Sequence, residues 1–167
     1  MFENISWENL NHLQVGRFAE YLVRMSFAVY GFEVYSPEVD DHGVDLIVRE
    51  ANGPFLEVQV KSVRGLQYVF FPKSKFQKRE NLLGAVVLFP KAQDSKQNEP
   101  KLFLIPSLEW GEEDALFCER DYGSPGQKSK PEYGMNISEK NMGLLEKYEF
   151  KSMIGRYSRF SALLQEG

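Results

Sequence analysis

Four polar residues on two neighbouring apolar segments have the types and the spacing of a site that does chemistry. Asp45 lies in the first segment, and Glu57, Gln59 and Lys61 lie in the second, after a turn at residues 52–54. Side chains alternate between the two faces of a β-strand. Glu57, Gln59 and Lys61 therefore share one face, and the apolar residues between them share the other. An acid, an amide and an amine aligned opposite an apolar face indicate a functional site.

The chemistry that suits these groups is phosphodiester hydrolysis. This reaction needs an attacking water, a stabilised phosphate and a neutralised leaving oxygen. Mg²⁺ held by hard oxygen ligands can serve these needs, and a nearby lysine can orient or deprotonate the water or stabilise developing charge. If the two strands pair as a hairpin that places Asp45 beside Gln59, the segments supply these parts.

The elements that would position these residues follow from hydrophobic periodicity and turn signals. A helix is expected over residues 11–30, ending at Gly31. The expected strands cover residues 32–35, 43–48, 55–61, 67–71, 84–89 and 102–105. Short helices are expected over 74–82, 141–148 and 153–164, and loops over 91–100 and 121–131. This order predicts one α/β domain over residues 1–167, with a core at about 11–110 and a variable C-terminal extension at 111–167.

The bulk composition narrows the class of protein. The chain has 167 residues, of which 43% are hydrophobic and 26% are charged, as in globular proteins. It lacks an apolar run of the ~20 residues that a membrane span needs, and its N-terminus does not read as a signal peptide. Cys118 is the single cysteine, so we expect a cytoplasmic protein. The formal net charge of −4 counts against a non-specific nucleic-acid coat protein.

These residues resemble a known family. The segment 43–45 followed by Gln59-Val60-Lys61 is similar to the PD-(D/E)XK nuclease superfamily, the restriction-endonuclease-like fold, and more closely to the branch with a D…QxK pattern. The helical segment 16–20, Gly-Arg-Phe-Ala-Glu, is similar to the G-x-x-(G/A)-E of its first helix. Segments 71–76 and 104–107 resemble uncharacterised bacterial members. The resemblance implies an N-terminal helix, then a central mixed β-sheet flanked by helices, with a metal site on the second and third strands.

The resemblance also implies roles for individual residues. A Mg²⁺ or Mn²⁺ ion would be held by ligands from the helix and the two strands: Asp45, Gln59 through its amide oxygen, the Val60 carbonyl, Glu20 and Glu57. Lys61 would act on the water or the phosphate. Glu57 would restore the charge that the amide lacks, or pair with Lys61. Glu20 has a simpler alternative, an exposed helical carboxylate paired with Arg17 or Arg24.

Two functions follow as hypotheses. The first is a divalent-metal-dependent endonuclease that cleaves DNA, with a homodimer favoured if it cuts duplexes. The second is a weak or inactive nuclease-fold module that binds nucleic acid or a protein partner, because a neutral amide binds Mg²⁺ more weakly than a carboxylate. A basic patch of four residues is either a solvated surface or a contact for the phosphate backbone: Lys73, Lys75, Lys78 and Arg79.

Overall fold

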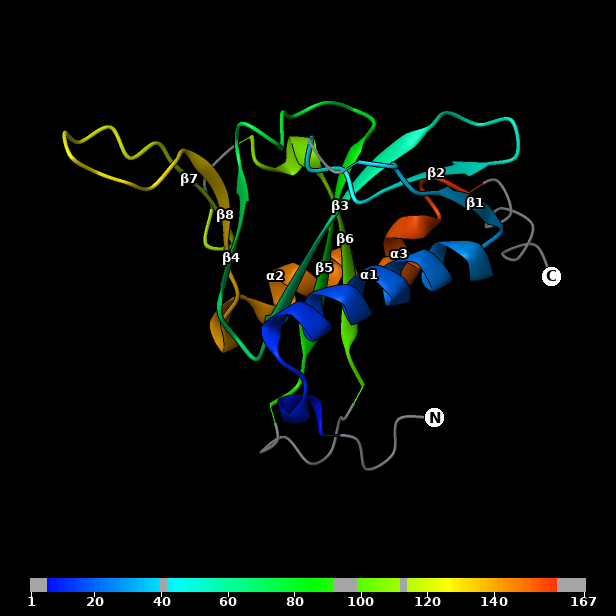
Figure 1. The fold of residues 1–167 in the computed structure, drawn as a ribbon, viewed down its shortest axis with the longest axis horizontal. Coiled ribbons are helices and arrows are strands. Elements are labelled where there is room, and N and C mark those ends of the chain that lie inside the picture. Colours follow the sequence, from blue (N-terminus) through cyan, green and yellow to red (C-terminus); the bar gives the residue numbers. More distant parts are fainter. Residues whose placement is uncertain (1–5, 40–41, 92–98, 112–113, 159–167) are drawn as a thin grey trace.

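A five-stranded mixed sheet forms the centre of the protein (Figure 1). The computed structural model describes residues 6–39, 42–91, 99–111 and 114–158. The strands of this sheet, in spatial order, are β1 (Phe32–Tyr35), β2 (Leu46–Glu50), β3 (Leu56–Arg64), β5 (Leu82–Phe89) and β6 (Lys101–Pro106). β3 and β5 run parallel, and the other neighbours are antiparallel. The sheet is therefore mixed, as the resemblance implies.

A second, smaller sheet packs beside the first. It is antiparallel, in the order β4 (Tyr68–Pro72), β8 (Glu132–Asn136) and β7 (Phe117–Arg120). The helices are α1 (His12–Val29), α2 (Met142–Leu145) and α3 (Phe150–Ile154), with single 3-10 turns η1 (Trp7–Asn9), η2 (Ser107–Glu109), η3 (Glu139–Asn141) and η4 (Glu146–Tyr148). In Figure 1 the small sheet and the β1–β2 hairpin stand at opposite ends of the molecule.

The central sheet is apolar on both faces at β5, because each face there is covered by a different layer. α1 and α3 pack on one face, where they join Leu83 and Val87 of β5 in one core cluster. The small sheet and α2 pack on the other face, where Leu82 and Val86 join a second cluster. Every residue of β5 is buried, which explains its uninterrupted apolar sequence.

Local sequence signals set the bounds of α1. The Asn11 side chain accepts from the Gln14 backbone N–H at 3.0 Å, and the Asn11 N–H donates to Gln14 Oε1 at 2.8 Å. This reciprocal capping satisfies two donors at the helix start. Gly31 follows the helix with φ +84°, a left-handed conformation that favours glycine.

The predicted α/β class and the order of an N-terminal helix followed by a mixed sheet are confirmed. The predicted helix over 74–82 is wrong. The N–H groups of Lys75 and Phe76 both donate to the Pro72 carbonyl at 2.9 Å, and irregular chain follows this single turn. Phe76 is fully buried, but the segment offers no second apolar residue one turn later that would hold a helix on the core.

The C-terminal third contains structure that the sequence pattern does not reveal. β7 and β8 lie beyond residue 111 and complete the sheet begun by β4. The expected helix at 141–148 is divided into η3, α2 and η4. The expected helix at 153–164 is replaced by α3, which begins earlier, and the last nine residues, 159–167, lie outside the described part. Among the described residues, none of the helices combines the length and the apolar character needed to cross a membrane.

Candidate functional site

Asp45 lies at the start of β2, directly against the backbone of β3. Leu46 pairs with Val58, and the Asp45 N–H donates to the Val58 carbonyl at 3.0 Å. The Val60 N–H donates to Asp45 Oδ2 at 2.6 Å. The antiparallel register continues from Leu46↔Val58 to place Asp45 beside Gln59. Because the N–H and C=O of one strand residue leave on the same edge, the Val60 carbonyl is also directed toward the side on which Asp45 lies.

Gln59 carries the most unusual polar group of this region. Its residue is only 4% exposed, and its Oε1 atom has no hydrogen-bond partner within the described part of the chain. A buried acceptor without a partner costs about 1–3 kcal/mol. An amide oxygen next to a carboxylate is a hard donor pair, which suits Mg²⁺ or Mn²⁺. The donors present therefore fit a divalent cation.

Gly43 closes over Gln59. Its φ of +77° is a left-handed conformation. A Cβ atom at Gly43 would lie 3.1 Å from Gln59 Nε2 and 2.8 Å from Lys75 Cβ. The loop before β2 can approach the buried amide this closely only because residue 43 has no side chain.

Lys61 lies in a groove of about 480 Å³ between the start of α1 and strands β3 and β4. Its Nζ atom is 5.9 Å from the centre of the Phe71 ring. Phe71 in turn lies against Gly84, where a Cβ would come within 2.9 Å of the ring. Gly84 is the β5 partner of Gln59. Gln59 and Lys61 thus occupy the same face of β3, under the small sheet.

Glu20 is on the face of α1 that approaches the start of β2. Its carboxylate forms an ion pair with Arg17, with an N–O distance of 2.6 Å. One helical turn later, Arg24 Nη2 donates to the Asp45 carbonyl at 2.8 Å, and Nη1 bonds the Ser36 hydroxyl. The contact between Arg24 and Asp45 was missed at the sequence level, since nothing in its spacing distinguishes it from a solvated helical arginine.

Glu57 lies on the same face of β3 as Gln59, on the side of Gln59 away from Lys61. It pairs in register with Ile47, and its carboxylate forms an ion pair with Arg79. Both residues line a second groove of about 620 Å³, together with His42 and the exposed Lys75. Within the described residues there is no cluster of three or more His, Cys, Asp or Glu side chains that could hold a metal. The donor set around Asp45 consists instead of one carboxylate with amide and carbonyl oxygens.

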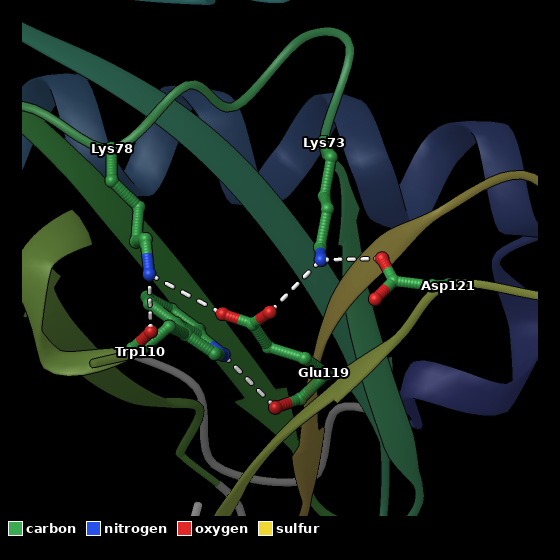
Figure 2. A network of polar contacts seen from close by, with 6 residues as sticks. Lys73, Lys78, Trp110, Glu119 and Asp121 are labelled. Atoms are coloured by element: carbon green, nitrogen blue, oxygen red, sulfur yellow. Dashed lines mark hydrogen bonds and ion pairs between the residues drawn. The ribbon is translucent and has the colours of Figure 1, made fainter. Parts of the chain in front are cut away.

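Two lysines of the basic patch are neutralised by the C-terminal third of the chain (Figure 2). Lys73 Nζ lies 2.6 Å from Asp121 and 2.9 Å from Glu119. Lys78 Nζ lies 3.3 Å from Glu119 and 2.7 Å from the Trp110 carbonyl. These bonds raise the pKa of Lys73, and the bond from Lys73 lowers the pKa of Glu119. With Arg79 paired to Glu57, the patch is less cationic than its sequence indicates.

No family model matches the chain, and no curated protein matches it. Among solved structures, the chain is similar to Hjc, a Holliday junction resolvase from Archaeoglobus fulgidus, with 12% identity and a TM-score of 0.48 over 86% of this chain and 98% of that one. It is also similar to the bacterial homing endonuclease I-Ssp6803I, with 15% identity and a TM-score of 0.43 over 94% of each chain. Both similarities are distant, so the residue roles depend on the geometry of this chain. The chain combines an N-terminal helix with a mixed sheet, and it places Asp45 just before the second strand and Gln59 on the third.

Proposed function

We propose that the protein is a divalent-metal-dependent endonuclease that hydrolyses phosphodiester bonds in DNA. One observation carries the proposal. Gln59 Oε1 is buried on β3 and has no hydrogen-bond partner among the described residues, and the N–H of the next residue, Val60, donates to the Asp45 carboxylate. A buried acceptor of this kind is expected where a ligand completes its coordination, because its desolvation is otherwise uncompensated.

In this proposal three oxygens hold the cation: the Asp45 carboxylate, Gln59 Oε1 and the Val60 carbonyl. A divalent cation bound there would stabilise negative charge on the phosphate and activate water. Lys61 would bind a phosphate oxygen from the groove in which it lies. Arg24 would keep the start of β2 in place through its bond to the Asp45 carbonyl. Glu20, one turn before Arg24, would contact the cation through water.

A second candidate is a nuclease-fold module that binds nucleic acid or a protein without cleavage. The observation that favours it is the low charge of the site, since one carboxylate is joined by a neutral amide that is only 4% exposed. Cations of the basic patch are also tied to acidic side chains. Such a module would bind DNA in a salt-dependent way with no turnover.

Cleavage assays distinguish the two candidates. Labelled duplex, branched and single-stranded DNA would be incubated with Mg²⁺ or Mn²⁺ and the wild-type protein, Asp45→Ala or Lys61→Ala. We expect both variants to lose roughly 100-fold or more of the cleavage rate, as when one stabilising group is removed from an active site. Glu146→Ala and Lys147→Ala, at exposed positions of η4, are the matched controls and should cleave at the wild-type rate.

Mn²⁺ binding followed by calorimetry gives a readout that does not require turnover. Asp45→Ala should abolish the binding heat, and Glu146→Ala should preserve it. Absence of cleavage with either metal would reject the endonuclease and leave the binding module. If the enzyme cuts both strands of a duplex, we expect a homodimer, because one site cuts one strand at a time, and gel filtration would reveal it.

A further inference from the structure

The small sheet presents aromatic side chains on the face that points away from the core. Along β4, Val69 and Phe71 are buried in the second core cluster. Tyr68 and Phe70 alternate with them and point outward. Phe70 is 46% exposed, although a large aromatic side chain is usually buried when the core can accept it.

The Tyr68 ring lies on this outer face, over β8. Its hydroxyl donates to the buried carboxylate of Glu132 on β8 at 2.7 Å, and Tyr122 donates to the same oxygen at 2.9 Å. Gly134 lies beneath, and a Cβ there would be only 2.0 Å from the Tyr68 hydroxyl oxygen. Burial and the bond to Glu132 raise the pKa of Tyr68, which keeps the hydroxyl a neutral donor. With its hydroxyl anchored, the Tyr68 ring is held in a fixed orientation on this face.

Tyr68 belongs to a row of flat groups. The Tyr68 and Phe70 rings are stacked with an interplanar angle of 21° and centroids 6.3 Å apart. The Arg120 guanidinium, from β7, lies 4.4 Å from the centre of the Tyr68 ring. We name Phe70, Tyr68 and Arg120 the stacking row. It runs across the outer face from β4 at one edge of the small sheet to β7 at the other.

The stacking row opens onto the candidate catalytic lysine. Tyr68 and Phe70 line the same groove of about 480 Å³ as Lys61, with His12 and Gln67 on its walls. This volume lies within the range of about 300–1,000 Å³ of ligand pockets. Two cations therefore border the row: Lys61 shares the groove with Tyr68 and Phe70, and Arg120 lies over the Tyr68 ring.

We propose that the stacking row binds unpaired bases of a DNA strand, whose phosphate backbone continues along the groove to Lys61. This inference rests on the proposed function for the identity of its ligand and names its substrate class, DNA with a single-stranded segment. Aromatic rings and arginine planes stack on any base, while nearby cations follow the backbone. A duplex keeps its bases stacked on one another and would present only phosphates to this face. The β7–β8 loop, which extends outward beside the sheet in Figure 1, carries the exposed Lys128 and Lys130 as further backbone contacts.

The test measures binding without cleavage, in the Asp45→Ala background. Fluorescence anisotropy would compare a labelled oligothymidylate with a blunt duplex of the same length. Phe70→Ala should weaken binding of the oligothymidylate by roughly 5- to 100-fold, the loss of one stacked base, and Phe70→Tyr should retain it. Phe55→Ala is the matched control, since Phe55 is 50% exposed and also lies under an arginine, Arg49, at 4.8 Å. It should leave binding unchanged.

Several results would overturn the proposal: no binding of the oligothymidylate, no effect of Phe70→Ala, an equal effect of Phe70→Ala on the duplex, or an equal loss in Phe55→Ala. Circular dichroism must show Phe70→Ala folded, as expected for a half-exposed side chain. The two proposals fail separately. Phe70-dependent binding without any metal-dependent cleavage would reject the endonuclease and keep the stacking row. Asp45-dependent cleavage with binding unaffected by Phe70→Ala would do the reverse.

Discussion

Replacing Gln59 with methionine should stabilise the metal-free protein while it weakens metal binding. Methionine keeps the length of the side chain and removes Oε1, the buried acceptor without a partner among the described residues. Removing an unsatisfied acceptor recovers about 1–3 kcal/mol, and a volume-conserving swap costs less than about 1.5 kcal/mol. We therefore expect a net gain in the free energy of unfolding of about 1 kcal/mol in EDTA. For a chain of 167 residues this is an increase in Tm of about 2–4 °C.

Added Mn²⁺ should make the wild-type protein more stable than Gln59→Met, the reverse of their order in EDTA. At a Mn²⁺ concentration of about 100 times Kd, a bound ion stabilises the native state by about 2.7 kcal/mol. The wild-type protein would receive this stabilisation, and Gln59→Met would lose most of it together with the amide ligand. The wild-type protein should then be the more stable of the two by about 1–2 kcal/mol, which is the difference between the two effects.

Thermal unfolding by circular dichroism, in EDTA and in a Mn²⁺ series, measures both effects. Gln77→Met is the matched control, because Gln77 is exposed and should change neither Tm nor its metal dependence. The reasoning is refuted if Gln59→Met is clearly less stable than the wild-type protein in EDTA. It is equally refuted if Mn²⁺ raises the Tm of both proteins by the same amount, since the amide would then have no part in binding.

Three further predictions test the surroundings of the site. Gly43→Ala should lower the free energy of unfolding by about 1–2 kcal/mol in urea titrations, because φ is +77° and the new Cβ would press on Lys75; unchanged stability would contradict the close approach. Arg24→Met should cost about 1 kcal/mol and weaken Mn²⁺ binding in calorimetry, since its bond to the Asp45 carbonyl is lost; unchanged metal affinity would show that α1 does not position β2. The bond from Lys73 lowers the folded pKa of Glu119 below 4.5, so this carboxylate stabilises the native state above pH 4.5 and the stabilisation disappears as pH falls through the lowered pKa. In urea titrations at a series of pH values, the free energy of unfolding of Glu119→Gln should therefore fall less on acidification than that of the wild-type protein. The same pH dependence in both proteins would argue against the ion pair.

Local patterns in the sequence determine the hairpin that carries the candidate site. The alternation in residues 55–61 assigns the faces of β3, and the short turn after β2 favours an antiparallel hairpin of the two strands. The capping residues Asn11 and Gln14 define the start of α1. These signals act over a few residues, so the order of helix and strands is predictable from one sequence.

Contacts between distant segments decided the remaining features: the pairing of the small sheet, the charge of the basic patch and the burial of Gln59. β4 pairs with β8, in a register that joins Tyr68 to Asn136, and no local pattern specifies a partner so far along the chain. The same assembly brings Glu119 to Lys73 and so removes charge from a segment that reads as a basic patch. The sequence by itself determined which polar residues share a face of β3. The tertiary structure decided that Gln59 is buried with an acceptor unsatisfied by described residues, because burial depends on what packs over a strand and not on the strand itself.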